Sequence, residues 1–377
     1  MNNQWKAWSA SIPLCVAIMA GGTAVNAAGF ANQDFSISGV GTANAVIAGV
    51  YDASAASYNP AAIAWGEGLN IQVNSNGRFR NNSVKVPTGV WPNLANAPDA
   101  VSTNITWMPH GSNFGLGLSL GTPFHNSTIW SPGMPNVPDS WLRVRRATFD
   151  IVYAATSTLS MAYGLDVYRA KTLMTQGLLS FSAKDKSSFG GHASFNWKIA
   201  PLWRMGLMLR KAPRLQLTAN NNELRLDLPD QIGLGISHDQ GNAVRWELDT
   251  EWSRWSALKD MSVRAINTGA VLMAAPASLR DTISIKAGMT WFWRRDTAFR
   301  FGYAYDQGAN KKSAFQPMIS DQAGHRLSLG FGGEMFGMNL DVAYSYAFYS
   351  KLKVSGTYAG EYRDRQTTLG VALSKAF

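Results

Sequence analysis

The chain has 377 residues, of which 46% are hydrophobic and only 15% are charged, and it contains 35 Gly, 17 Phe, 14 Trp and 12 Tyr. Few charges together with many glycines and aromatic residues favour an outer-membrane barrel over an average soluble enzyme. The net charge of +10 raises the question of nucleic acid, but no cluster of basic and aromatic residues forms a binding platform, so no nucleic-acid partner is expected.

Residues 1–27 have the pattern of a removable secretory signal peptide. Lys6 makes the beginning positive, residues 12–20 are mainly apolar, and residues 25–27 end in a small-residue cleavage site. The single cysteine, Cys15, lies inside this leader, so the mature chain is expected to have no disulfide and no thiolate metal site. No window of about 18 apolar residues follows the leader, so a helical membrane span is not expected.

Residues 28–66 form a segment rich in Gly, Ala and Ser that is too poor in large side chains to build a core of its own. We expect it to be an N-terminal hatch that plugs a barrel. Asn59-Pro60 starts a turn, and Pro60 in the first turn of a short helix loses no needed hydrogen-bond donor. Asn59 is expected to cap this helix by accepting a hydrogen bond from a free backbone N–H. A short helix held by one cap rearranges at low cost, as a gate requires, but the same cap also fits a static plug.

Residues 67–377 alternate between large apolar and small or polar side chains, which is the two-residue period of a β-strand. Leu340 and Val342, for example, are separated by Asp341. Fourteen strands are predicted, with ends uncertain by about two to four residues. They are 67–80, 101–109, 113–121, 145–157, 160–171, 189–199, 202–211, 224–238, 243–256, 282–293, 297–306, 325–335, 338–349 and 362–377.

The connections between these strands are alternately short, such as 336–337, and long, such as 122–144. Short turns at one end and long loops at the other are typical of an outer-membrane barrel, whereas a soluble sandwich would scatter its long connections. The even strand number returns both termini to the periplasmic end. The predicted fold is therefore all-β: a 14-stranded antiparallel transmembrane β-barrel plugged by a small N-terminal hatch. Phe377, aromatic and terminal on the last strand, resembles the assembly signal of bacterial outer-membrane proteins.

The third predicted strand is unusually rich in glycine. Gly115, Gly117 and Gly121 alternate with apolar residues, and Pro123 follows. Glycine weakens strands and often marks bulges or bends, so a kink or a gap in the wall is expected here. Small inward-facing residues that make room for the plug would give the same pattern.

Two long loops are unusually apolar for an extracellular surface. Their candidate substrate-capture residues are Phe124, Trp130, Met134 and Trp141 in loop 122–144, and Leu272 and Met273 in the run 269–279. Exposed apolar patches usually bind a partner or a ligand. The same side chains could instead pack on each other and close the mouth of the barrel, and the two interpretations carry equal weight.

Two inward-facing cations are candidates for contact with a carboxylate. Arg245 shares its strand face with Glu247, Asp249 and Glu251, so an ion-pair network is its expected role. Lys286 has fewer acidic neighbours and is the predicted carboxylate contact. Other basic residues lie near the long loops, including Arg143, Arg145 and Lys184. They are expected to face the phosphates of lipopolysaccharide, although an ordinary solvated rim explains much of this distribution.

Several blocks, in order along the chain, carry a resemblance to a known family. They lie at 28–30, 35–41, 52–54, 59–62, 228–237, 251–255, 300–307 and 325–330. As an ordered set they resemble the FadL/TodX family of outer-membrane transporters of long-chain fatty acids and other hydrophobic compounds. The residues that match the hatch of this family are Phe30, Asn59, Pro60 and Ala61.

The resemblance implies a monomeric protein of the bacterial outer membrane that takes up hydrophobic small molecules without a cofactor. Substrate is captured by an apolar groove among the extracellular loops, enters the lumen, and is released when the hatch shifts. It then leaves sideways through the wall beside a kinked third strand. The loops of this chain are shorter than expected for a fatty-acid member, so no loop residue of the family is carried over by position.

Other functions have less support in the sequence. The alternative is a plugged or general diffusion porin, but an open porin for hydrophilic solutes needs a wide and unplugged lumen. A structural or adhesive barrel is less favoured than either porin. A barrel enzyme would need a nucleophile beside a base, or paired acidic residues. The five histidines show no metal spacing and no nearby Gly-x-Ser-x-Gly, so no enzymatic activity is predicted.

Overall fold

The computed structural model describes residues 30–95, 100–130, 134, 137–294, 296–311, 315–319 and 321–377. The predicted signal peptide (1–27) and the first two residues of the predicted hatch lie outside these ranges. Within them, twenty-one strands belong to one antiparallel sheet, and three short helices precede it. None of the described helices is long and apolar enough to cross a membrane.

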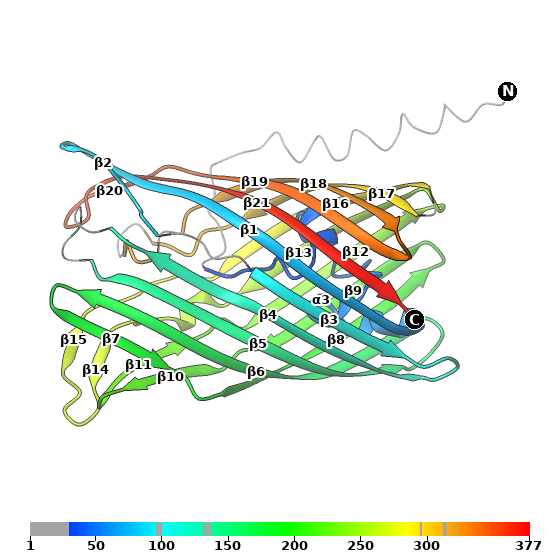
Figure 1. Cartoon of the computed structure of the whole chain (residues 1–377), viewed down its shortest axis with the longest axis horizontal. Helices are drawn as coiled ribbons and strands as arrows, with labels where there is room; N and C mark the ends of the chain where they lie inside the picture. Colours follow the sequence, from blue (N-terminus) through cyan, green and yellow to red (C-terminus); the bar gives the residue numbers. More distant parts are fainter. Residues whose placement is uncertain are drawn as a thin grey trace.

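Fourteen of the described strands close into a barrel, which confirms the predicted architecture. They are β1 (Gly68–Val86), β3 (Ala100–Met108), β4 (Phe114–Thr128), β5 (Asp139–Ala154), β6 (Leu159–Gln176), β8 (Ser188–Ala200), β9 (Trp203–Lys211), β12 (Gln231–Gln240), β13 (Val244–Ser253), β16 (Thr282–Arg294), β17 (Thr297–Asp306), β18 (Gly324–Met335), β19 (Met338–Tyr349) and β21 (Gly360–Ala376). Pairing of β1 with β21, from Asn70 opposite Ala376 to Lys85 opposite Glu361, closes the wall (Figure 1).

The remaining described strands extend the wall at the end of the barrel that carries the long connections, on the left in Figure 1. They are β2 (Gly89–Pro92), β7 (Leu179–Lys184), β10 (Arg214–Ala219), β11 (Asn222–Asp227), β14 (Val263–Ala265), β15 (Val271–Met273) and β20 (Leu352–Val354). The extended wall was not predicted: residues placed in the loops 122–144 and 172–188 continue the barrel strands β4, β5 and β6.

These strands extend beyond the membrane because their apolar residues move from the outer face of the barrel to the inner face along the strand. On β5, Phe149 and Ile151 point outward and are more than half exposed, whereas Leu142 and Val144 point inward and are buried. Within the membrane the apolar face of a strand contacts lipid. Beyond the membrane it must turn toward a protein core. The outward apolar pattern therefore ends before the strand does.

One predicted strand is wrong. The range 224–238 contains two elements, β11 and β12, separated by Leu228, Pro229 and Asp230. Pro229 has no N–H to donate to a ladder. The Asp230 carboxylate also has a partner outside the ladder, since it accepts the Ala212 N–H at 3.1 Å. The chain therefore leaves the extracellular β10–β11 hairpin here and enters the barrel anew as β12.

The described part of the hatch, residues 30–66, lies inside the barrel (Figure 1). It contains α2 (Ile37–Gly41), α3 (Ala55–Tyr58) and the 3₁₀-helix η3 (Pro60–Trp65). Every residue of α2 and α3 is buried. Ser36 caps α2 by accepting the Gly39 N–H at 2.9 Å. Helices this short are marginal alone, so the barrel wall must supply most of the contacts that hold them.

Candidate functional site

The central hatch segment 46–49 is held by carboxylates of the barrel strand β13. Asp249 accepts the N–H groups of Val46 and Ile47 at 2.7 and 2.9 Å. Glu247 accepts those of Ala48 and Gly49 at 2.6 and 3.0 Å. Backbone donors buried away from water need such partners. Two adjacent inward acids thus satisfy four consecutive amides of a segment about 200 positions away in sequence.

Asn59 joins the hatch to itself and to the wall. Its side-chain oxygen accepts the Ala61 N–H at 3.2 Å and so caps η3, with Pro60 in the first turn, as predicted. The Asn59 side-chain nitrogen donates to the carbonyl of Ile47 at 2.7 Å and to that of Phe195 on β8 at 3.1 Å. Asn59 is fully buried. It therefore fixes the turn between α3 and η3 to both the hatch and the barrel.

Ala61 is bonded to the wall on both sides of its peptide group. Its N–H donates to the Ser194 hydroxyl at 3.0 Å, and its carbonyl accepts from the Ser160 hydroxyl at 2.7 Å. Both serines face inward on neighbouring strands β6 and β8. The predicted hatch residues Asn59, Pro60 and Ala61 thus lie together at one contact between plug and wall.

The first described residues of the chain run along an irregularity in β4, the third barrel strand. The pairing of β4 with β5 shifts between Gly121 and Phe124. The carbonyl of Pro123, freed from the ladder, accepts the Asn32 N–H at 2.7 Å, and the carbonyl of Phe30 accepts the His125 N–H at 3.2 Å. The structure thus has a register shift next to Gly121 and Pro123, where the sequence predicts a kink or a gap in the wall. This part of β4 binds the N-terminal end of the described hatch, residues 30–32, which we call the arm.

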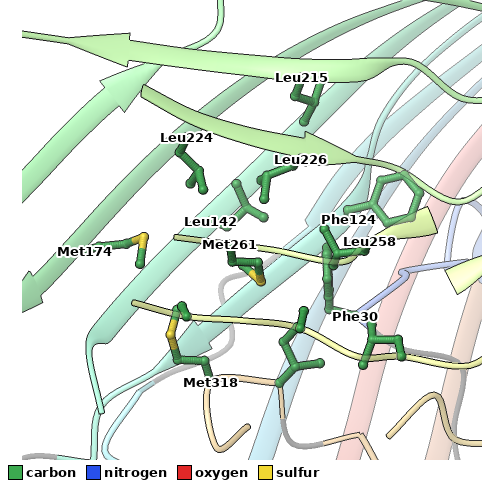
Figure 2. Packing of buried hydrophobic residues seen from close by; sticks show 14 of the residues in the cluster. Phe30, Phe124, Leu142, Met174, Leu215, Leu224, Leu226, Leu258, Met261 and Met318 are labelled. Atoms are coloured by element: carbon green, nitrogen blue, oxygen red, sulfur yellow. The ribbon is translucent and has the colours of Figure 1, made fainter. Parts of the chain in front are cut away.

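Phe30, at the tip of the arm, lies in an apolar cluster at the extracellular end of the barrel (Figure 2). Its ring is 6.0 Å from that of Phe124 and 4.8 Å from that of Trp255, measured between centroids. The predicted capture residues Phe124, Trp130 and Met273 are buried in this cluster, with at most 2% of each exposed. They are therefore packed against each other, and the apolar mouth is closed.

The other predicted capture residues are less buried. Met134 is partly buried and packs against the cluster, while Leu272 is 39% exposed. Trp141 points away from the cluster, and the Arg143 guanidinium lies 5.2 Å from its ring centroid. Just before β14, the Asp260 carboxylate accepts the Ser262 N–H at 2.9 Å and a hydrogen bond from Arg264 at 2.8 Å. Partial burial raises the pKa of Asp260, but hydrogen bonds from Arg264 and Ser262 outweigh burial and hold this pKa below its ordinary value.

The wall is thin where the glycines of β4 meet the hatch. A Cβ on Gly117 would lie 2.9 Å from Cδ1 of Ile63, the buried isoleucine of η3, and one on Gly115 would lie 3.6 Å from its Cγ2. A side chain at Gly117 would therefore press on Ile63 and on the Asp150 carboxylate, whereas one at Gly115 would collide with Met108 and reach Ile63 only in ordinary contact. On the outer side, the same part of the wall carries an apolar hollow of about 610 Å³. It is lined by Ile105, Trp107, Leu116, Gly117, Leu118, Phe149, Asp150, Ile151, Tyr163, Gly164 and Leu165.

The predicted carboxylate contact, Lys286, is not a free cation. Its ammonium group pairs with Glu251 at 3.1 Å and donates to the Gln33 side chain of the hatch at 2.6 Å. The expectation that Lys286 has few acidic neighbours is therefore wrong, because Glu251 on the adjacent strand reaches it. Arg245 pairs with Asp239 rather than with Glu247, and it donates to the carbonyl of Gly49 at 2.7 Å.

A second ion network behind the hollow has no counterpart in the sequence interpretation. His192 contacts Asp150 at 2.7 Å and Asp166 at 3.3 Å, and the guanidinium of Arg210 lies 3.1 Å from Asp166. All four side chains are buried in the lumen. In the sequence these residues stand out only as polar side chains at inward positions of β5, β6, β8 and β9. The sequence of one strand does not indicate which residues of the other strands lie next to it.

Comparison with known proteins agrees with this geometry. Residues 177–374, just over half of the chain, match the family model of the outer membrane protein transport proteins (OMPP1/FadL/TodX). A search of curated protein sequences finds no significant match.

Solved structures share the fold at low sequence identity. The Pseudomonas aeruginosa FadL homologue has a TM-score of 0.79 at 17% identity, covering 93% of this chain and 100% of that one. The Pseudomonas putida toluene transporter TodX gives 0.67 at 16%, covering 89% and 98%. The CymD monoaromatic hydrocarbon channel gives 0.67 at 18%, covering 91% and 97%.

The family consists of transport proteins rather than enzymes, and its barrels lie in the outer membrane. The barrel, the family model and the similar folds agree. The chain belongs to the FadL/TodX family of outer-membrane transporters of hydrophobic compounds.

Proposed function

We propose that this protein carries long-chain fatty acids or other hydrophobic small molecules passively across the outer membrane. In this scheme the substrate first enters the extracellular apolar cluster around Phe124 and Trp130. It then passes into the lumen when the hatch shifts, and it leaves sideways through the thin wall at Gly115 and Gly117. No energy source beyond the concentration gradient is required.

One observation carries the proposal: a single segment of chain touches both ends of this path. At the arm, Phe30 packs against Phe124 and Trp255 in the extracellular cluster. At η3, Ile63 backs the glycines of the wall. A substrate that displaces the Phe30 ring therefore acts on the same element that closes the lateral route. This arrangement supports coupling between capture and release.

The lateral route is also supported by what lies outside the wall. The outer hollow is lined mainly by apolar side chains, and Trp107, Leu116 and Phe149 in it are each about half exposed. A hydrophobic molecule that leaves through the wall here enters lipid directly. It avoids the water-filled periplasmic end, where apolar surface is unfavourable by about 25 cal/mol per Å².

A competition experiment tests the proposed function. Cells that lack other members of the family, and that express this protein, should accumulate labelled oleate or toluene faster than cells with an empty vector. An excess of unlabelled oleate, toluene or alkane should compete with the label, and the order of competition identifies the substrate class. Sugars at the same concentration should not compete.

Bilayer recording of purified protein, together with the same uptake assay, distinguishes the main alternative, a diffusion porin. If purified protein gives large steady currents in a planar bilayer, and hydrophobic compounds fail to compete for uptake in cells, the protein is a diffusion porin and the proposed function is wrong.

A further inference from the structure

Five basic side chains form a compact group on the outer wall, near the end with the long connections. In the register of the sheet, Arg145 of β5 lies opposite Arg169 of β6, and Arg143 lies opposite Lys171. Lys171 in turn lies opposite Lys184 of β7. We call these residues the cation ladder. Each of its cross-strand pairs brings two positive charges together.

The ladder faces away from the protein. Its members alternate along their strands with buried inward residues such as Val144 and Ala170, and four of the five are exposed, with Arg143 half-buried. Within the described ranges, none of the five forms an ion pair with a carboxylate. Farther along the sheet, Lys184 lies opposite Thr218, which faces Glu223, and that acid is already paired with Arg225 at 2.8 Å.

Like charges directly opposite each other destabilise a sheet. Three such pairs on three adjacent strands are therefore unfavourable, and no carboxylate of the described residues neutralises them. Anions from outside the chain can neutralise them. Phosphate is the best match, since Arg and Lys bind its oxygens through charge-assisted hydrogen bonds.

The ladder lies directly above the apolar hollow of the outer wall. Below its two rungs, the outward pairs between β5 and β6 are Ala147 with Val167, then Phe149 with Leu165, then Ile151 with Tyr163. The last two pairs line the hollow of about 610 Å³. At a rise of about 3.3 Å per residue, Ile151 lies roughly 20 Å along the strand from Arg145. This order of charge above and apolar surface below is the order within a membrane lipid.

We propose that this face of the barrel is a binding site for lipopolysaccharide of the outer leaflet. The phosphates of the lipid lie on the cation ladder, and its acyl chains lie in the hollow beneath. Two cationic rungs about 7 Å apart along the strands suit a headgroup with more than one phosphate better than the single phosphate of a phospholipid. The site uses no residue of the hatch, and it shares only the outer hollow with the proposed transport path, where that path reaches lipid.

Binding of lipid to purified protein in detergent free of lipopolysaccharide tests the site. The variant Arg145→Gln with Arg169→Gln removes one rung, while Lys351→Gln with Lys353→Gln removes two exposed cations from the connection after β19 and serves as the matched control. Lipopolysaccharide should bind the rung variant about tenfold more weakly than the wild-type protein, as expected for loss of about 1.4 kcal/mol. The control variant should bind within twofold of wild type.

Two further titrations identify the ligand chemistry. Dephosphorylated lipopolysaccharide, and phosphatidylglycerol at equal concentration, should each bind wild-type protein at least about tenfold more weakly than the intact glycolipid. Equal binding by the rung variant, or equal binding of phosphatidylglycerol, would overturn the proposal. The hatch variant Asn59→Ala with Pro60→Ala should bind lipopolysaccharide like wild type, so failure of the transport scheme and failure of this site are read out separately.

Discussion

Replacing Glu247 and Asp249 together by alanine is expected to turn the closed barrel into a leaky channel. The two carboxylates hold four consecutive hatch amides, from Val46 to Gly49. A buried donor left without a partner costs about 1–3 kcal/mol, and every 1.4 kcal/mol changes a population ratio about tenfold. The fraction of barrels with a displaced hatch should therefore rise by at least about tenfold. Single-channel recording in a planar bilayer should show this as steady ion currents that wild-type protein lacks.

The neighbouring cations keep their partners in this variant, because Arg245 pairs with Asp239 and Lys286 pairs with Glu251. The wall itself should remain intact. A matched control is Glu223→Ala with Asp227→Ala, which removes two carboxylates from the extracellular β10–β11 hairpin. If the Glu247/Asp249 variant shows no more current than this control, the carboxylates do not anchor the hatch.

The variant Asn59→Ala with Pro60→Ala is expected to lower uptake of hydrophobic substrate about tenfold without preventing barrel assembly. Loss of the cap costs about 1 kcal/mol, and two further hydrogen bonds, to Ile47 and Phe195, are lost with it. Alanine also favours helix where Pro60 now breaks it, so α3 and η3 can fuse. Ile63 would then leave the wall glycines, and η3 could no longer return to its place behind them after the proposed shift of the hatch.

Uptake of labelled oleate or toluene measures this effect, and the change in gel mobility on heating confirms that the barrel is folded. The variant Pro201→Ala with Asn242→Ala changes the same two residue types in exposed turns at the end with the short connections and should keep normal uptake. Normal uptake by a correctly inserted Asn59/Pro60 variant would remove the gate from the scheme.

The barrel was accessible from sequence because lipid imposes a strict pattern on each strand that crosses it. The strands predicted at 297–306 and 338–349 coincide with β17 and β19. Their apolar residues face outward over the whole length, so alternation and strand end together. On β5 the apolar side changes beyond the membrane, and alternation of outward apolar residues therefore underestimated this strand.

The hatch contacts were accessible only in part. The cap at Asn59 is local, since donor and acceptor lie within three residues, and its sequence signature is specific. Glu247 and Asp249 were assigned to Arg245 because they share a strand face with it. Their real partners are backbone amides of the hatch, and an amide has no signature in the sequence. The prediction for Lys286 is wrong for a related reason: its partner Glu251 lies on the neighbouring strand, and the sequence does not show which residues of two strands meet.

The apolar loops illustrate a different limit. Their composition correctly marked Phe124, Trp130 and Met273 as special, but it did not distinguish an open groove from a packed cluster. Packing depends on side chains from many elements meeting at one place, here including Phe30 from the hatch and Trp255 from η4 (Trp255–Ala257). Passage of a substrate from this cluster into the lumen requires the hatch to shift, which is the central claim of the transport scheme.

A disulfide between hatch and wall tests that claim most directly. The Ser57 hydroxyl of α3 contacts the Asn104 side chain of β3 at 2.6 Å, and both residues are buried. Because Cys15 is the chain's only cysteine and lies in the predicted leader, the variant Ser57→Cys with Asn104→Cys places one defined pair of thiols at this contact for oxidative cross-linking. Each single variant serves as a control that cannot form the cross-link.

Uptake of labelled hydrophobic substrate is compared before and after reduction of the cross-linked protein in cells. The scheme predicts that uptake falls to the level of the empty vector while the disulfide is present, and that a membrane-permeant reductant restores it. Uptake at the wild-type rate with the cross-link intact would show that the hatch need not move, and it would contradict the proposed mechanism.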